Sequence, residues 1–413
     1  MVQISPVTRA LVPVDAAAAG QISAPNYDEF QSDREVWDLL QEKPESVLRV
    51  TMPHCHVASV DAIGEDGSAD ALEHAGEQMR SLIDSTLTRE LPGVLWVYEI
   101  RSPKRPDAPQ IGLGGYARTI DIRTDGNPDG NIIRNEGIRQ EKADGRSRLI
   151  KATGSYIGTV NLAVRDAANQ LLPALEDVTS SRSCDYAATD EAGNEHSVWL
   201  ITDPDHIERF STLLDQEPAA YVADGNHRSA AAADLGLEHF LAVFFPTSRL
   251  GLEPYNRLLP DTGVDTDRFF ESLAGPFEVE ALGDVDTFRP ASVHEIGLYT
   301  DGKWYRLTPR EGSYDQQDAA QAIDADIVQR HLIDGILGIS DARDDRINYV
   351  GGNKDAAWLK SRVDAGDFRY AVSLAPVTMD QFVAVCEQNR FMPPKSTWFD
   401  PKIRSGLVIA ILD

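Results

Sequence analysis

The stretch Tyr221-Val-Ala-Asp-Gly-Asn-His-Arg-Ser229, followed by four alanines, predicts a short buried strand that turns directly into a helix. Gly225 permits a tight turn, Asn226 is a good candidate for the helix N-cap, and the alanines favour helix. A helix start offers backbone N–H donors and a partial positive charge, which suit a phosphate or carboxylate. An ordinary strand–turn–helix with polar caps has the same pattern, so both interpretations stay open.

The side chains of this turn carry the chemistry that an anion site needs. Asp224 could ligate a metal or act as a base, and His227 could donate a proton. Arg228 could hold an anion through its planar fork of donors. The sequence therefore predicts phosphate or nucleotide binding by Gly225, Asn226, His227 and Arg228.

Composition excludes some classes of partner. The chain has 413 residues, and its 39 basic and 66 acidic side chains give a formal net charge of −27. Non-specific binding to nucleic acid needs a basic face, so we expect no nucleic-acid partner. No apolar run approaches membrane-spanning length and no signal segment is recognisable, which predicts a soluble cytoplasmic protein. Composition does not decide the oligomeric state, and a homo-oligomer stays open.

Three cysteines, Cys55, Cys184 and Cys386, lie far apart in the sequence. Their odd number and wide spacing predict a reducing compartment without a disulfide framework. Cys55 lies within His54-Cys55-His56, which could bind a metal. The motif lacks a second ligand pair at zinc-site spacing, so a structural or surface role is the favoured interpretation.

The order of expected elements predicts an α+β fold with two domains. Residues 1–260 are expected to form a mixed-sheet first domain that contains the Asp224 turn. Residues 261–413 are expected to form a smaller α/β domain, ending in a rigid tail that returns to a cleft. Residues 46–51 alternate in hydrophobicity like a strand. Residues 135–148 are strongly polar, which is typical of a solvated helix or loop.

Several motifs together resemble one family, the bacterial and archaeal proteins of domain-of-unknown-function family 1015. The resemblance runs nearly from end to end, and its closing Pro-Pro-Lys-Ser-Thr-x-Phe-x-Pro-Lys motif is especially specific. The motifs that carry it are Ala24-Pro25-Asn26-Tyr27-Asp28, the stretch from Asn135-Glu136 to Arg146, Ala223-Asp224-Gly225-Asn226-His227-Arg228, Pro254-Tyr255-Asn256-Arg257-Leu258, Gly338-Ile339 with Tyr349-Val350-Gly351-Gly352, and residues 392–407.

The Asp-Gly-x-His-Arg signature is also similar to that of the ParB/sulfiredoxin-like superfamily. That superfamily includes nucleotide-binding partition proteins, sulfiredoxins and free serine kinases, and its signature holds nucleotide phosphates at a helix start. The resemblance implies a ParB/sulfiredoxin-like first domain and phosphoryl chemistry. Two positions depart from the family pattern: Asn226 stands where a second histidine is common, and Asn135 precedes Glu136 where the family tends to have His-Glu.

These observations predict a nucleotide-dependent kinase that phosphorylates the hydroxyl of a small metabolite, with free serine as the first candidate. Glu136 or Asp224 would accept the hydroxyl proton or ligate Mg²⁺, and ATP or ADP would be the nucleotide. A phosphatase or other phosphoryl hydrolase could use the same anion site. A nucleotide-binding regulatory protein without catalysis is the third alternative.

Further candidate residues lie outside the central turn. Lys395, Ser396 and Thr397 could bind phosphate, or could be a surface turn ordered by the two prolines before them. Arg257, beside Asn256, could pair with a substrate carboxylate or with an internal carboxylate. Asp28 is a weaker substrate-binding candidate, because its motif could simply anchor the amino-terminal segment.

Overall fold

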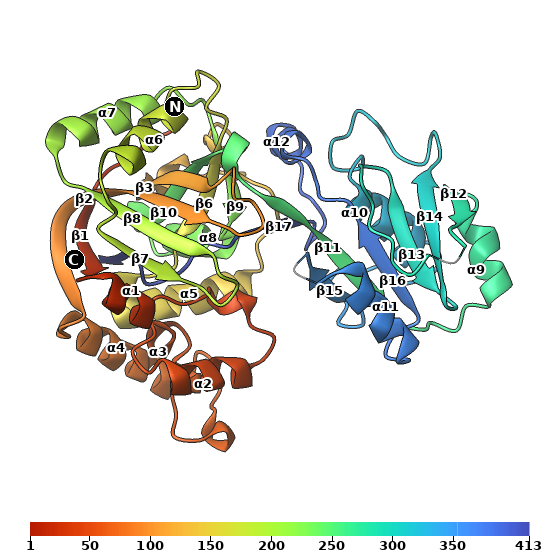
Figure 1. Cartoon of the computed structure of the whole chain (residues 1–413), viewed down its shortest axis with the longest axis horizontal. Coiled ribbons are helices and arrows are strands. Elements are labelled where there is room, and N and C mark those ends of the chain that lie inside the picture. The colour runs from red at the N-terminus through yellow and green to blue at the C-terminus, as the bar shows by residue number, and fades with distance from the viewer. Residues whose placement is uncertain (284, 353, 413) are drawn as a thin grey trace. The chain divides into compact units, whose positions relative to one another are not determined.

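The computed structural model describes residues 1–283, 285–352 and 354–412, which form two compact units. Unit 1 comprises residues 1–134, 138–250 and 401–413, and unit 2 comprises residues 135–137 and 251–400 (Figure 1). The expected boundary after residue 260 therefore lies within unit 2, because strand β11 (Leu252–Leu259) belongs to that unit. The α+β fold class is confirmed, since both units combine helices with a sheet.

Unit 1 is built on a mixed sheet of eleven strands. Its central part runs β9-β6-β10-β3-β2-β1, with β10 parallel to β6 and antiparallel to β3. The strands are β1 (Val7–Pro13), β2 (Thr88–Arg101), β3 (Gln110–Arg118), β4 (Ile132–Arg134), β5 (Ser155–Tyr156), β6 (Val160–Val164), β7 (Tyr186–Thr189), β8 (Glu195–Ile201), β9 (Ala220–Asp224), β10 (His239–Pro246) and β18 (Ile409–Ile411).

A close contact between β2 and β3 explains one of the glycines in this sheet. Trp96 on β2 pairs with Gly114 on β3. A Cβ atom on Gly114 would lie 1.9 Å from the indole ring of Trp96, so only glycine fits beneath the ring. The absence of a side chain at Gly114 therefore lets the Trp96 ring lie close to the backbone of β3.

Helices cover the sheet of unit 1 (Figure 1). Helices α4, α5 and α8 pack side by side, and α6 packs on β2 and β3. The predicted strand over residues 46–51 is wrong: Leu48–Thr51 forms α3, and all four of its residues are buried. The helical segments are α1 (Ala16–Ile22), η1 (Tyr27–Glu29), α2 (Asp33–Glu42), α3 (Leu48–Thr51), η2 (Pro53–Cys55), η3 (Val60–Ala62), α4 (Ala69–Ile83), η4 (Thr119–Asp121), α5 (Gln140–Thr153), α6 (Leu171–Ser181), α7 (Pro204–Leu214), α8 (Asn226–Asp234) and η5 (Thr247–Arg249).

The carboxyl-terminal segment from Pro401 is part of the unit 1 core. Strand β18 pairs with β1, with Ala410 opposite Ala10. The Gln110 side chain donates a hydrogen bond to the carbonyl of Pro401 at 3.0 Å, and the Tyr186 hydroxyl donates to the carbonyl of Leu407 at 2.8 Å. Buried side chains thus hold this segment through its backbone.

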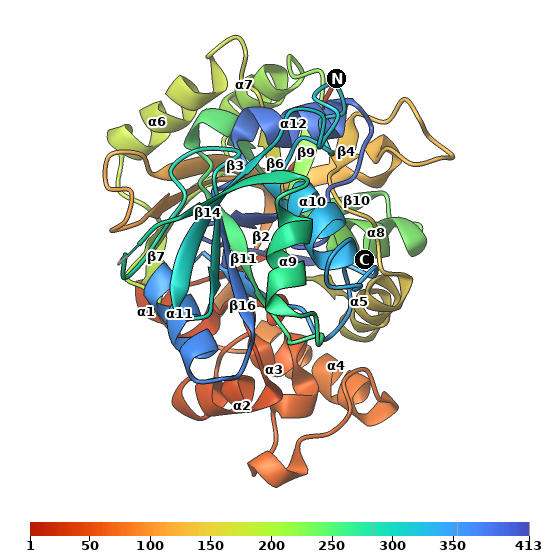
Figure 2. The same cartoon turned by 90° about the vertical axis from the view of Figure 1, so that its right-hand side faces the viewer.

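Unit 2 is built on an antiparallel sheet of seven strands in the order β12-β14-β13-β16-β11-β15, with β17 paired to β11. Three of these strands, β14, β11 and β16, are labelled in Figure 2. Helix α11 packs on β13 and β16. The remaining elements are β12 (Phe277–Ala281), β13 (Ile296–Thr300), β14 (Lys303–Pro309), β15 (Asn348–Gly351), β16 (Tyr370–Leu374), β17 (Thr397–Phe399), α9 (Thr266–Leu273), α10 (Asp324–Val328), η6 (Gln329–Asp334), α11 (Ala356–Asp364) and α12 (Met379–Glu387). None of the helices in the described part of the chain has the length and apolar character needed to cross a membrane.

Candidate functional site

The predicted strand–turn–helix is present in unit 1. Strand β9 is buried as far as Ala223, and helix α8 begins at Asn226. The N-cap is Gly225 with φ +98°, and not Asn226 as the sequence suggested. Only glycine adopts this backbone conformation without strain, so Gly225 sets the angle between strand and helix. The positive end of the α8 dipole lies at this turn.

Arg228 is the most tightly held side chain of the motif. Only 5% of it is exposed. Its Nη1 donates to Oδ1 of Asn26 at 2.9 Å and to the carbonyl of Thr159 at 2.7 Å, and its Nη2 donates to Asp224 at 3.1 Å. These bonds use three of the five N–H donors of a guanidinium. Burial lowers the pKa of Arg228, but nearby carboxylates, Asp224 first, outweigh it and keep the pKa above its ordinary value.

Arg228 forms part of the wall of a pocket that lies entirely within unit 1. The pocket has a cavity volume of about 40 Å³, and hydroxyl side chains such as Thr51 and Ser155 line it together with apolar ones. On its wall the Arg146 guanidinium lies 3.9 Å from the centre of the Tyr27 ring. The Arg146 side chain is only 11% exposed, although its polar stretch of sequence predicted a solvated segment. Two arginines therefore meet at one pocket.

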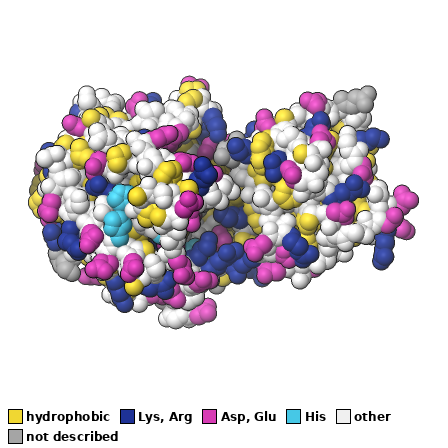
Figure 3. Space-filling view, turned by 90° about the horizontal axis from the view of Figure 1, so that it is seen from below, with side chains coloured by type: hydrophobic (Ala, Val, Ile, Leu, Met, Phe, Trp, Pro, Cys, Tyr) yellow, Lys and Arg dark blue, Asp and Glu magenta, His cyan; other side chains and the backbone are white. Residues whose placement is uncertain are grey.

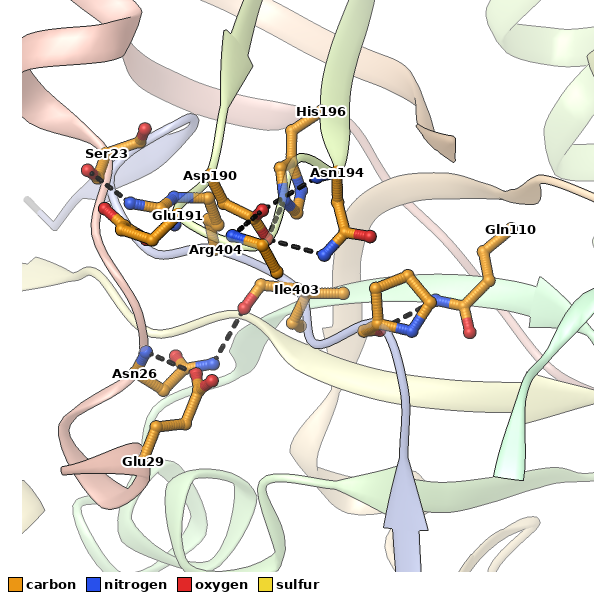
Figure 4. A network of polar contacts seen from close by, with 12 residues as sticks. Ser23, Asn26, Glu29, Gln110, Asp190, Glu191, Asn194, His196, Ile403 and Arg404 are labelled. Atoms are coloured by element: carbon orange, nitrogen blue, oxygen red, sulfur yellow. Dashed lines mark hydrogen bonds and ion pairs between the residues drawn. The ribbon is translucent and has the colours of Figure 1, made fainter. Parts of the chain in front are cut away.

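Asn26 joins the amino-terminal motif to the carboxyl-terminal segment (Figure 4). Its Oδ1 accepts hydrogen bonds from Arg228 and from the hydroxyl of Ser405, and its Nδ2 donates to the carbonyl of Ile403 at 2.9 Å. Its backbone N–H donates to Oε1 of Glu29 at 2.7 Å. Asn26 is itself buried, so these contacts fix the pocket wall that it shares with Tyr27.

Glu29 is a titratable group that the sequence did not single out. Its pKa is raised from the ordinary 4.5 to about 7, mainly by burial and also by the charge of Asp28, against the opposing effect of Lys402. A carboxyl group with a pKa near 7 can exchange a proton at neutral pH, as a general base or acid requires. Asp28, the predicted substrate contact, is exposed beside it.

Asp224 balances two cations. Its Oδ2 accepts from Arg228 at 3.1 Å and lies 3.4 Å from the Lys402 ammonium. The other predicted magnesium ligand, Glu136, belongs to unit 2. Asp224 is paired with two cations in unit 1, and the magnesium site predicted at Asp224 and Glu136 stays a prediction.

His227 is held as a neutral acceptor. Its Nε2 accepts a hydrogen bond from the backbone N–H of Arg139 at 3.0 Å, so the ring proton is on Nδ1. Burial, with a smaller effect from the charge of Lys142, lowers the pKa of His227 to about 4. At neutral pH this side chain can donate one hydrogen bond from Nδ1 and carries no charge.

The other predicted residues belong to unit 2, where protein contacts hold several of them. Arg257 is 2% exposed and donates to the carbonyls of Tyr255 and Lys395. Asn256 accepts from the backbone N–H of Leu374 at 3.0 Å. Burial lowers the pKa of Arg257 to about 10. These side chains hold the strand β11 and the tail segment, in a part of the fold distinct from the unit 1 pocket.

The Lys-Ser-Thr motif lies at the start of β17. Ser396 donates to the carbonyl of Pro393 at 2.7 Å, and Thr397 pairs with Pro254 of β11. Lys395 has φ +58°, and its ammonium lies 5.2 Å from the centre of the Tyr255 ring. The motif is a turn ordered by local bonds, and its predicted phosphate contacts stay a prediction.

Comparison with known proteins assigns the chain to a family. Residues 4–332 match the family described as protein of unknown function (DUF1015). The chain belongs to this family. The match covers most of the chain, which confirms the family expected from the Asn26 and Asp224 motifs. No curated protein sequence is significantly similar to it.

Two solved structures of similar topology are more distant. A conserved hypothetical protein from Pyrococcus furiosus has 13% sequence identity and a TM-score of 0.36, with 72% of this chain and 95% of that chain covered. A free serine kinase in complex with AMP has 11% identity and a TM-score of 0.38, with 72% and 92% covered.

Proposed function

We propose that the unit 1 pocket binds the phosphates of a nucleotide and that the protein transfers a phosphoryl group to the hydroxyl of a small metabolite. The observation that carries this proposal is the meeting of Arg146 and Arg228 at one pocket beside the start of α8. Both side chains are nearly buried in a chain of net charge −27. Asp224 pairs with Arg228 at 3.1 Å, whereas the ion pair of Arg146 with Asp66 is 3.6 Å long. An anionic ligand would therefore mainly offset the cost of burying Arg146.

The donors of these two arginines support the assignment to phosphate. The bonds of Arg228 to Asn26, Thr159 and Asp224 leave Nε and one hydrogen of Nη2, which we assign to a ligand oxygen. The contact of Arg146 with Asp66 is 3.6 Å long, a loose ion pair that a phosphate could replace. Phosphoryl transfer depends mostly on positioning and charge neutralisation, and two fixed guanidinium groups supply both.

Glu29 is the proposed general base. Its pKa of about 7 places the carboxylate form within reach at physiological pH, and Lys402 and Asp224 are among the charges that act on it. The carboxylate would accept the proton of the attacking hydroxyl, which becomes the bridging oxygen of the phosphate ester. His227 would donate from Nδ1 to a phosphate oxygen as a neutral side chain.

Phosphoryl transfer is tested directly by incubating the full chain with serine and either ATP or ADP and detecting phosphoserine by ³¹P NMR. Activity should rise with pH through about 7, since Glu29 must lose its proton. Glu29→Gln should abolish transfer and retain nucleotide binding, whereas Glu35→Gln, at an exposed position in α2, should retain both. Nucleotide binding without transfer to serine or any other hydroxyl acceptor would contradict the kinase proposal and favour a regulatory protein.

A further inference from the structure

A second group of chemically active side chains lies away from the pocket, at the start of α2. Asp33 is the first residue of α2, and His54 and Cys55 form the end of η2. One ligand atom from each of the three lies within 4.8 Å of the other two. His54 and Cys55 are buried, and Asp33 is exposed, so the cluster has one open side.

The distance between His54 and Asp33 fits two ligands of one metal ion better than it fits a hydrogen bond. Nε2 of His54 is 3.4 Å from Oδ1 of Asp33, whereas N–H···O bonds are about 2.7–3.2 Å long. Metal–ligand bonds of about 2.0–2.2 Å at a tetrahedral angle place neighbouring ligand atoms about 3.3–3.6 Å apart. The observed distance lies within that range.

The second nitrogen of the His54 ring faces another carboxylate. Nδ1 is 3.5 Å from Oδ1 of Asp66 and has no hydrogen-bond partner among the described residues, although the side chain is only 1% exposed. A carboxylate on the far nitrogen is the usual second partner of a metal-binding histidine, because it fixes the tautomer and the ring orientation. Asp66 thus stands where such a partner belongs.

We propose that Asp33, His54 and Cys55 bind one divalent transition-metal ion, with zinc as the best match. Thiolate, imidazole and carboxylate are the three ligand types that zinc takes, and three protein ligands leave a fourth position for water on the exposed side. The sequence motif around Cys55 lacked a further ligand at zinc-site spacing, and the fold supplies it from the start of α2. The bound ion ties α2 to the segment that follows α3.

A different metal position is available nearby, and the experiment must separate the two. Nδ1 of His56 lies 2.9 Å from Nε2 of His74, and the two rings are stacked. This pair contains no thiol. Figure 3 shows one face of the molecule, on which histidine side chains gather among acidic ones. Cobalt(II) distinguishes the positions because a bound thiolate gives it a charge-transfer band that imidazole does not.

The test uses the tag-free full chain, stripped with a chelator and titrated with Co²⁺ alone. We expect one equivalent to bind with a thiolate charge-transfer band that Zn²⁺ then displaces. Cys55→Ser should remove the band, and Asp33→Asn, an exposed change that does not threaten folding, should weaken binding at least tenfold. The matched controls Cys184→Ser and Asp38→Asn, the latter an exposed residue of α2, should change neither.

Two results would overturn the proposal. One is the absence of stoichiometric Co²⁺ binding to the folded chain, which would leave His54 as a side chain held between two carboxylates. The other is binding without the thiolate band that is lost in His74→Gln, which would place the ion at the His56 and His74 pair.

Discussion

Two regions of the molecule carry the residue types of a phosphate site, and they differ in what surrounds them. In unit 1, the helix start at Gly225 adjoins a pocket with two nearly buried arginines on its wall. In unit 2, the Lys395-Ser396-Thr397 turn is held by bonds to Pro393 and by pairing with β11. A small pocket adjoins Ser396 as well, but among the described residues its lining contains Asp324 and no arginine. The two regions therefore differ in the charge of the side chains around the hollow, and the unit 1 pocket is the one suited to an anion.

The same contrast applies to the two buried arginines. Arg228 pairs with a carboxylate and reaches a pocket, whereas Arg257 donates to backbone carbonyls of Tyr255 and Lys395. Asp224 compensates the charge of Arg228, so the burial of Arg228 alone does not require an anionic ligand. Arg146 is the cation whose nearest carboxylate is more distant, at 3.6 Å. It is therefore the residue on which ligand binding should depend most.

The largest expected effect follows from removing the Arg228 guanidinium. Arg228→Met removes one of the cations paired with Asp224 and deprives Asn26 and Thr159 of a donor. Breaking a buried ion pair in this way costs about 3–5 kcal/mol of unfolding free energy, measured by urea denaturation. The exposed Arg209 of α7 is the control, and Arg209→Met should change stability by less than about 0.5 kcal/mol. Equal losses in the two variants would contradict the structural role of Arg228.

A smaller loss is expected from the corresponding change in unit 2. Arg257→Met removes donors to neutral carbonyls and leaves no carboxylate without its partner, so we expect a loss of about 2 kcal/mol. Nucleotide binding to the folded variant should equal that of the wild type. A loss of ligand binding without a loss of stability would indicate that Arg257 contacts the substrate, and would show that unit 2 also takes part in binding.

The pKa of Glu29 predicts how stability depends on pH. Because the folded-state pKa is raised from 4.5 to about 7, the native state binds the proton more tightly than the unfolded state. This contribution is fully present below about 4.5 and is lost as the pH rises through about 7. Glu29→Gln keeps the neutral form, so it should gain about 3 kcal/mol over the wild type at pH 8 and almost nothing at pH 4. Parallel stability profiles from pH 4 to pH 8 would show that Glu29 titrates normally.

The smallest effect on stability is expected for Lys395→Ala. The side chain is exposed and its ammonium lies over the ring of Tyr255, an interaction worth about 0.5–1 kcal/mol at such sites. If the turn is only structural, kcat and the nucleotide Kd should both stay unchanged. A fall in kcat with an unchanged Kd would instead give Lys395 the charge-neutralising role that its sequence suggests. Unit 1 would then bind the nucleotide, and Lys395 of unit 2 would act in the transfer step.

The sequence predicted those parts of the fold that depend on local signals. The turn at Gly225 and the α+β class follow from residue types that favour particular backbone conformations. The segment that forms α3 was predicted as a strand, because the pattern of polar and apolar residues over 46–51 resembles alternation. Such alternation is typical of a strand with one exposed face, whereas the structure buries all four residues of α3. Burial on all sides is a property of tertiary packing, and no short window of sequence reports it.

The candidate site was predictable only in part, for a similar reason. Asn26, Arg146, Arg228 and Ser405 meet at one pocket from positions far apart in the chain. The polar stretch around Arg146 predicted a solvated segment, because sequence alone could not show that Tyr27 covers its guanidinium. Glu29 was missed because its raised pKa comes mainly from burial. The available sequence signal near Glu29 was the motif Ala24-Pro25-Asn26-Tyr27-Asp28 directly before it.

The central claim is that the unit 1 pocket binds a nucleotide through Arg146, and calorimetric titration of ADP tests it most directly. We expect saturable ADP binding to the wild type and to Arg209→Gln, and at least a tenfold rise in Kd for Arg146→Gln. The rise follows because one charged hydrogen bond contributes about 1.5–3 kcal/mol. Arg146→Gln should remain folded because its side chain is at the pocket wall. An unchanged Kd in the folded Arg146→Gln variant, or no ADP binding to the wild type, would contradict nucleotide binding through Arg146.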